Sequence, residues 1–484
     1  MKPLGLQRTT LRLHPDPARV LVRPFYPTSD QRAGRICACV LALAEDRVHA
    51  LLHQVLAEFG ERHLKIHDFL KRRYQQVRQY FSADTQLSEE RQLLLAAYFT
   101  HEYSLEAAAL FNPSIVPHPD QSDLAPGSLR FILSLRATGE GHISSITFRT
   151  GFLHADGRIE INEPVRYTLE PDQVPNAAYE KGLFERKLQE LGLAGHFSRQ
   201  VLQRLGDSFT LDELRGSVNG VVKQEQSRNQ ETEAAARKTL MLAQSNYEVR
   251  FAPDSRLSAR VLFPVTPSQS NGIEDARFVR FQNEDGSRTY YATYTAYDGK
   301  LILPQFIETP DFLRFKFITL NGPAVQNKGM ALFPRKVNGR YAMLGRQDYE
   351  NIYVMFSEHL HFWHETQLVL RPAFPWEFIQ IGNCGSPIET ERGWLVLSHG
   401  VGPMRKYCLG AFLLDLDDPT KVIGRLPEPL LQANEQEREG YVPNVVYSCG
   451  SLLRDRQLIV PYAMSDYATT FATVSLDAVL DRME

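Results

Sequence analysis

The sequence predicts a mainly β fold, a five-bladed β-propeller with an N-terminal helical region and a helical insertion. Two observations predict this fold. Short strand-like segments of similar form recur along most of the chain, whereas two stretches show the three- and four-residue spacing of apolar side chains that is typical of helices. The expected boundaries are 1–108 for the mainly helical region, 109–484 for the propeller and about 172–246 for the insertion.

The first helical stretch runs from about residue 30 to 110. Apolar residues recur there on one helical face, among them Val48, Leu51, Leu52, Val55, Leu56 and Phe59. Four histidines, His49, His53, His63 and His67, accompany this face. Histidines four residues apart on a helix can bind a metal, but no H-E-x-x-H motif is present. We therefore expect solvated or core-edge histidines and no metal site.

The strand repeats give the number of blades. Each has a polar turn, then a strand that usually begins with an aromatic residue, then a polar end: RTYYATYTAYDG (288–299), GRYAMLGRQD (339–348), RGWLVLSHGV (392–401) and RQLIVPYAMSD (456–466). One residue near the start of each strand, Tyr290, Tyr341, Trp394 and Leu458, marks the repeat, and these residues are 51, 53 and 64 positions apart. LRFILSLRA (129–137) is a fifth unit. Gly139 and Gly141 are expected to join that strand to the next one. Several short strands per period of this size indicate propeller blades.

Composition limits the classes of partner. With 54 Lys and Arg against 57 Asp and Glu, the net charge is −3, so no basic field favours nucleic acid. No run of 18 apolar residues predicts a membrane span, and the first residues, MKPLGLQRTTLRLHPDP, lack an apolar signal segment. The five cysteines are odd in number and lack C-x-x-C spacing, so we expect reduced thiols and a cytoplasmic protein.

Residues at matching positions of propeller blades meet near one central channel. The repeats would bring together there two carboxylates, Asp275 of the IEDAR segment and Asp466, and a set of cationic and polar side chains: Arg136, Arg277, Lys328, Arg346, His399 and Tyr407. Each residue alone is as well explained by a turn, a solvated surface or a packed core. Several cations facing one channel repel each other unless an anion lies between them, and phosphate is a natural occupant.

The chain resembles glycoside hydrolase family 130, the β-mannoside phosphorylases and related β-mannosidases with a five-bladed propeller. The similar segments include IEDAR (273–277), NKGMALFPRKVNGRYAMLGR (327–346), GWLVLSHGV (393–401), REGYVPNVVYSCG (438–450) and YAMSD (462–466). The resemblance covers roughly 110–165 and 245–484, leaving out the N-terminal helices and the insertion. Two positions depart from the family pattern: Ala276 replaces a proline, and Gln380 lies where many phosphorylases have an arginine.

The resemblance implies a role for each candidate residue. Asp275 would be the general acid. The phosphate-binding groups would be Arg277, Lys328, Arg346, His399 and Tyr407. Groups that hold the sugar would be Asn112, Arg136, Glu274 and Asp466. No cofactor is expected, because inorganic phosphate is a co-substrate beside the β-mannoside oligosaccharide.

The residue chemistry leaves three functions open. An inverting phosphorylase that releases mannose 1-phosphate needs one acid and a phosphate site, and Arg277 would share a strand face with Asp275 because it lies two residues on. An inverting β-mannosidase needs in addition a base for water, for which Glu377, Glu350 and Glu439 are available. A non-catalytic carbohydrate-binding propeller is the third alternative. The helical additions are candidates for a homo-oligomer interface.

Overall fold

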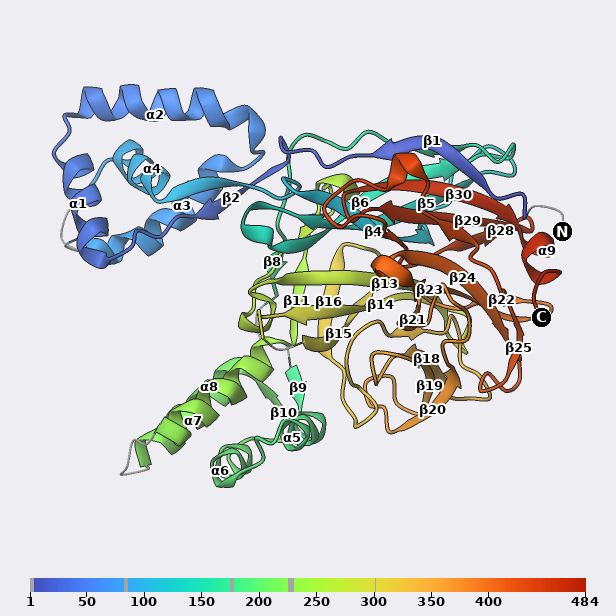
Figure 1. Cartoon of the computed structure of the whole chain (residues 1–484). Helices are drawn as coiled ribbons and strands as arrows, with labels where there is room; N and C mark the ends of the chain where they lie inside the picture. Colours follow the sequence, from blue (N-terminus) through green and yellow to red (C-terminus); the bar gives the residue numbers. More distant parts are fainter. Residues whose placement is uncertain (1–3, 82–85, 175–177, 225–229, 301) are drawn as a thin grey trace.

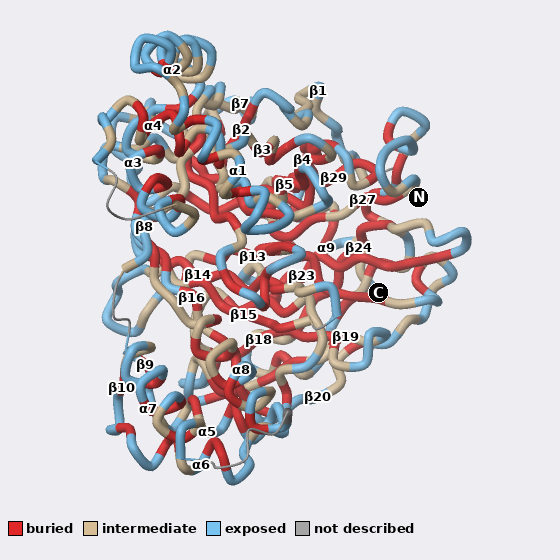
Figure 2. The backbone as a smooth tube through the Cα atoms, turned by 90° about the vertical axis from the view of Figure 1, so that its left-hand side faces the viewer, coloured by how far each residue is buried: buried red, intermediate tan, exposed pale blue. Residues whose placement is uncertain are grey.

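The computed structural model describes residues 4–81, 86–174, 178–224, 230–300 and 302–484, and it is mainly β (Figure 1). The buried residues are concentrated in the strands of the central region and on the inner faces of the helices (Figure 2). Within the described residues, no helix has both the length and the apolar character required to cross a membrane.

The N-terminal helices form a small unit with its own core (Figure 1). Its elements are β2 (Val20–Pro24), α1 (Asp30–Leu41), α2 (Glu45–Phe59), α3 (Ile66–Val77), α4 (Glu89–Tyr98) and β3 (Thr100–Ser104), and β2 pairs with β3. Ser29 and Ser88 cap α1 and α4, because their hydroxyls accept hydrogen bonds from the backbone N–H three residues on. The expected apolar face of α2 is confirmed in Val48 and Leu52, which are buried against the other helices.

One large sheet holds the first two strand meanders. The first comprises β4 (Ala109–Pro117), β5 (Leu129–Thr138), β6 (Ser144–Leu153) and β7 (Ile159–Ile161), with β12 (Val261–Leu262) also on β6. The second comprises β13 (Gly272–Gln282), β14 (Arg288–Tyr297), β15 (Ile302–Thr309) and β16 (Arg314–Thr319), followed by β11 (Tyr247–Arg250) and β8 (Asp172–Gln173). Among the described residues, the β-pairing that joins the two meanders into one sheet is the parallel pair of Gly272 with Ser144. The expected hairpin through Gly139 and Gly141 is confirmed as the β5–β6 connection.

Three smaller antiparallel sheets follow. The first contains β17 (Ala331–Leu332), β18 (Tyr341–Gly345), β19 (Ile352–Ser357) and β20 (Glu365–Leu370). The next contains β21 (Gln380–Asn383), β22 (Ile388–Thr390), β23 (Gly393–Val401), β24 (Tyr407–Leu414), β25 (Val422–Arg425) and β26 (Leu431–Gln432). The last contains β27 (Val446–Tyr447), β28 (Leu452–Arg454), β29 (Gln457–Met464) and β30 (Ala468–Ser475), before α9 (Leu476–Leu480).

A strand from the beginning of the chain completes the last sheet. β1 (Gln7–Leu13) pairs antiparallel with β30, so that Gln7 lies opposite Thr473 and Leu13 opposite Thr469. The sequence analysis did not predict this strand. The pairing covers the edge of β30, which would otherwise present unpaired N–H and C=O groups.

The insertion is largely helical and has a separate core. It contains β9 (Ala178–Glu180), α5 (Lys181–Glu190), α6 (His196–Gln203), β10 (Ser208–Thr210), α7 (Leu211–Gln224) and α8 (Gln230–Gln244). Residues 175–177 and 225–229 of the predicted insertion lie outside the described residues. Lys187 anchors it to the β region, because its Nζ donates to the Leu320 carbonyl at 2.7 Å. The N-terminal helices and the insertion lie at opposite ends of one side of the β region (Figures 1 and 2).

Candidate active site

Two β-bulges position the central carboxylate. In β13 the register with β14 shifts between Glu274 and Arg277, and Asp275 has a φ of 53°. In β4 the register with β5 shifts between Phe111 and Ser114, and Asn112 has a φ of 48°. Positive φ is tolerated best by Asn and Asp among non-glycine residues, and a bulge re-aims its side chain. The sequence predicted that Asp275 and Arg277, two residues apart, share one face of a regular strand. This prediction is wrong, because the bulge interrupts the alternation of side chains between the two faces.

The bulges bring Asn112 and Arg136 onto the Asp275 carboxylate. Oδ1 of Asp275 accepts from Asn112 Nδ2 at 2.7 Å and from Arg136 Nη1 at 3.2 Å. Arg136 Nη2 also donates to Glu274 Oε1 at 2.8 Å, and Lys328 Nζ lies 3.7 Å from Glu274 Oε2. The sequence prediction that these residues gather in one place agrees with this geometry. The result is a buried carboxylate, Asp275, and a half-buried one, Glu274, among cations.

The surroundings set the charge of Asp275. Burial by itself would raise the pKa of Asp275, but Arg136, Lys328 and Arg277 outweigh it and lower the pKa to about 2. With these neighbours the carboxylate is ionised at neutral pH. A bound anion would offset the same cations and raise the pKa again.

Asp466, in the turn after β29, has the opposite shift. Burial and the nearby negative charge of Asp275 raise the pKa of Asp466 to about 6, against the opposing effects of Arg136 and Arg405. The pKa shifts of the two aspartates are thus opposite, and Asp466 binds a proton more readily than Asp275 does.

A small recess beside Asp275 has cationic walls. It is lined by Arg277, Lys328, Gly329, Arg346, Gly382, Asn383, His399 and Tyr447, with no carboxylate among these described residues. The Nε atoms of Arg277 and Arg346 are buried without a hydrogen-bond partner among the described residues. Unpaired buried donors are costly, and guanidinium groups bind phosphate in bidentate fashion. The recess is therefore suited to an oxyanion.

Hydrogen bonds fix the orientation of the two arginines. Arg277 Nη2 donates to the Tyr447 hydroxyl at 2.7 Å, and Arg277 Nη1 donates to the Asp275 carbonyl at 3.3 Å. Arg346 Nη1 lies 3.3 Å from His399 Nε2. Because a guanidinium can only donate, Nε2 of His399 must accept this hydrogen bond.

His399 is a neutral part of the wall. Burial, followed by the charges of Arg346 and Arg277, holds the pKa of His399 well below its usual range. A Cβ at Gly382 would lie 2.5 Å from His399 Cε1, so only glycine lets β21 approach this ring. His399 thus lies where the sequence predicted, but it adds no positive charge to the recess.

The recess differs from the sequence prediction at three positions, Tyr407, Tyr447 and Asn383. Tyr407 was expected to bind phosphate, but it stacks beside His399 with ring centroids 5.9 Å apart, and Gln380 Nε2 lies 3.4 Å from its hydroxyl. Among the described residues, Tyr447 lines the recess and Tyr407 does not. Asn383 also lines it and donates to the Gly329 carbonyl at 2.6 Å. Asn383 lies in the GNCG segment and Tyr447 in the YSCG segment. Neither side chain is charged, so the cationic pattern of the sequence did not single them out.

None of the three candidate bases for a hydrolase is among the described residues that line this recess. The buried Glu377 carboxylate accepts from the N–H groups of Ala373 and Phe374, at 2.8 and 2.9 Å, and pairs with Arg425. Glu350 and Glu439 are exposed, and neither is among the residues that line the recess. The geometry thus assigns Glu377 a structural role.

Comparison with known proteins gives the family. Residues 229–484 match the model of glycoside hydrolase family 130, described as beta-1,4-mannooligosaccharide phosphorylase. A 1,2-beta-oligomannan phosphorylase of Thermoanaerobacter sp. is 38% identical over 219 residues, 44% of this chain and 71% of that protein. A beta-1,2-mannobiose phosphorylase of Listeria innocua is 30% identical over 231 residues, 46% of this chain and 63% of that protein.

A solved structure is also similar. The complex of the Listeria innocua beta-1,2-mannobiose phosphorylase with beta-1,2-mannobiose aligns with a TM-score of 0.46 and 20% identity, over 78% of this chain and 92% of that one. The family match extends over more than half of this chain and includes the segments of Asp275, Arg277, Lys328, Arg346 and His399. The chain therefore belongs to glycoside hydrolase family 130.

Proposed function

We propose that this protein is an inverting β-mannoside phosphorylase, which cleaves a β-mannoside with inorganic phosphate and releases mannose 1-phosphate. The observation that carries the proposal is the recess of Arg277, Lys328 and Arg346 beside Asp275. A phosphate dianion there would meet three cations and the unpaired Nε donors of both arginines. The named relatives, which are phosphorylases of β-mannosides, support the same activity.

The residues divide the chemistry between an acid and a phosphate site. An oxygen of phosphate attacks the anomeric carbon from the face opposite the leaving group, the glycosidic C–O bond breaks, and the leaving oxygen takes the proton of Asp275. Phosphate supplies the nucleophile, so no second carboxylate is needed as base. Its charge also offsets the cations that lower the pKa of Asp275, and Asp275 thereby gains the proton it must donate.

Among the alternatives, hydrolysis has less support from the site. An inverting β-mannosidase needs a carboxylate base that holds a water opposite the acid. Glu377 is engaged by two backbone N–H groups and Arg425, and Glu350 and Glu439 are exposed. A non-catalytic carbohydrate-binding protein would have no use for the cationic recess beside an acid.

We also propose that the strand meanders are the five blades of a propeller. Five antiparallel groups support this: β4–β7, β13–β16, β17–β20, the sheet of β21–β26, and β27–β30 with β1. The pairing of β1 with β30 would join the two ends of the chain within one blade. The proposed organisation keeps 1–108 as a mainly helical region, 109–484 as the propeller and about 172–246 as an insertion, with both helical parts available for a homo-oligomer interface.

The direct test is an assay of β-mannobioses of each linkage, with and without phosphate. The proposal requires mannose 1-phosphate to form, and turnover to depend on phosphate concentration. Release of free mannose at a rate unchanged by added phosphate would overturn it and support the hydrolase.

A further inference from the structure

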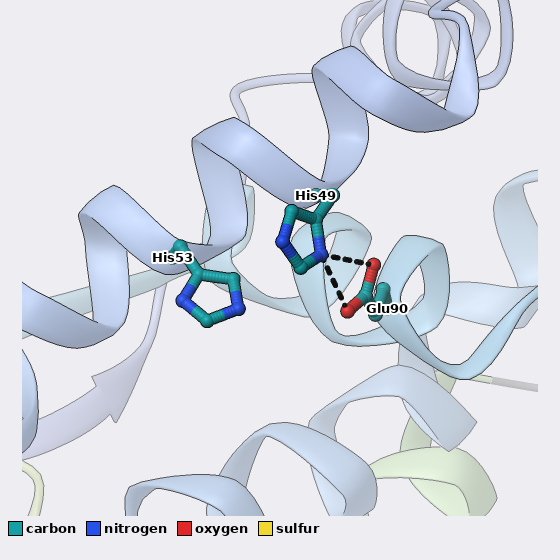
Figure 3. A group of neighbouring side chains, drawn as sticks. All are labelled: His49, His53 and Glu90. Carbon is teal, nitrogen blue, oxygen red and sulfur yellow. Dashed lines mark hydrogen bonds and ion pairs between the residues drawn. The ribbon is translucent and has the colours of Figure 1, made fainter.

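A cluster of metal-binding side chains lies in the N-terminal helices, outside the family match. His49 and His53 are four residues apart on α2 and face the same way, and Glu90 reaches them from the first turn of α4 (Figure 3). His49 Nδ1 lies 2.9 and 3.1 Å from the two carboxylate oxygens of Glu90. The two imidazole rings have centroids 4.3 Å apart.

The spacing of these donor atoms suits a small divalent ion. One donor atom from each residue lies within 4.8 Å of the other two. Zinc binds imidazole nitrogen and carboxylate oxygen at about 2.0–2.2 Å, which puts the donors of a tetrahedral site roughly 3.3–3.6 Å apart. The shortest donor separation here, 2.9 Å between His49 and Glu90, is below that range, and the upper limit for the three residues, 4.8 Å, is above it. Side-chain rotations alone can therefore bring the three donor atoms to the distances of a zinc site. We propose that His49, His53 and Glu90 bind a divalent transition metal, with zinc as the best-matched ion.

The other histidines of this region provide a contrast. His63 is buried and its Nε2 lies 2.7 Å from Glu102 Oε1, which leaves it engaged elsewhere. His67 is exposed on α3 and is not part of the cluster. A simple ion pair of His49 with Glu90 would be exposed and weak. The expectation of solvated or core-edge histidines agrees with their burial, because His49, His53 and His67 are exposed and His63 is buried beside Glu102.

The proposed ion would join α2 to α4. Both histidines are exposed and Glu90 is half-buried, so solvent can supply the remaining coordination positions. On the same helix, Leu51, Val55 and Phe59 border a cavity of about 590 Å³ that Leu94 of α4 also lines. A metal between the two helices would hold α2 over this cavity, and we expect it to raise thermal stability.

The test is zinc binding to the full-length protein without an affinity tag, after treatment with a chelator. Calorimetric titration with zinc chloride should show one saturable site per chain. His53→Ala should weaken the affinity at least about tenfold, since loss of even an outer-sphere partner typically costs 10–100-fold. This variant leaves the His49–Glu90 contact in place, so a loss of binding cannot be attributed to a broken ion pair. His67→Ala is the matched control and should bind as the unaltered protein does.

Two further measurements make the test decisive. Cobalt(II) should give a visible absorption band of the bound ion in the unaltered protein that is lost in His53→Ala and in Glu90→Gln. Zinc should raise the melting temperature of the unaltered protein and of His67→Ala, but not of His53→Ala. The proposal is overturned if no saturable site is found, or if His53→Ala binds zinc as tightly as His67→Ala.

Discussion

At the scale of single residues, Asp275 is held by two donors at once. Asn112 and Arg136 come from β4 and β5, and both reach the same oxygen of the carboxylate. The other oxygen is left for a proton or a sugar. Only 8% of the residue is exposed, so water has little access to it. These features suit a general acid that is shielded from solvent and whose low pKa would rise when phosphate binds beside it.

Asp275→Asn should abolish most activity while the protein remains folded. The amide preserves the shape of the side chain but cannot give up a proton, and general acid catalysis contributes about 10²–10⁴-fold. The measurement is kcat on a β-mannobiose with saturating phosphate, with circular dichroism as the check on folding. Asp285→Asn, in the exposed β13–β14 turn, is the control and should retain full activity. Near-normal turnover by folded Asp275→Asn would remove the acid assignment.

Asp466→Asn should stabilise the protein, and more so at high pH. Because the pKa of Asp466 is raised to about 6, its protonated form is favoured on folding. That stability is fully present below the ordinary aspartate pKa and is lost as pH rises through about 6. Asparagine imitates the neutral form, so the gain should be small at pH 4 and on the order of 1–3 kcal/mol at pH 8. Thermal unfolding at both pH values measures it, and an equal shift at both would contradict the raised pKa.

At the scale of elements, the segment before β21 depends on Glu377. Its carboxylate accepts from two successive backbone N–H groups, Ala373 and Phe374, and pairs with Arg425 on β25. This arrangement fixes the turn that leads into β21, which carries Gly382 and Asn383 into the recess. Glu377 therefore acts on the recess indirectly, by holding the segment that leads into β21.

Glu377→Gln should lower stability more than it changes catalysis. The glutamine keeps one acceptor but loses the charge opposite Arg425, and a charged hydrogen bond of this kind contributes about 1.5–3 kcal/mol. We expect a lower melting temperature and a Michaelis constant for phosphate near that of the unaltered enzyme. Glu389→Gln breaks the exposed pair with Arg335 and is the matched control, with little effect on either quantity. A well-folded Glu377→Gln as inactive as Asp275→Asn would instead identify a base and favour hydrolysis.

At the scale of the whole molecule, the site is assembled from separate sheets. Arg136 and Asp275 belong to the large sheet, Arg346 follows β18, His399 lies on β23 and Tyr447 on β27. The large sheet carries Asp275 together with Arg277 of the recess, whereas the remaining walls of the recess come from the later sheets and the segments between them. Misplacement of a later sheet should therefore disturb the recess and leave Asp275 in place.

Arg346→Ala should raise the phosphate requirement without a matching change in mannoside binding. The guanidinium lines the recess and its Nε has no partner among the described residues, so an anion is its natural acceptor. Loss of a charged hydrogen bond predicts a Michaelis constant for phosphate about 10–100-fold higher. Arg340→Ala, at the exposed start of the same hairpin, is the control. If the phosphate dependence of Arg346→Ala equals that of the control, the recess does not bind phosphate.

The sequence by itself determined the local features of this protein. Apolar spacing predicted the helices around α2, strand repeats predicted the meanders, and the charged segments singled out Asp275, Arg277, Lys328 and Arg346, because such patterns depend on near neighbours. The tertiary structure decided what depends on distant partners. It placed β1 on β30, made His399 neutral through burial and Arg346, and brought Glu90 to His49. The strand register, burial and charge at these sites depend on contacts between residues far apart in the chain. Local sequence patterns therefore do not predict them.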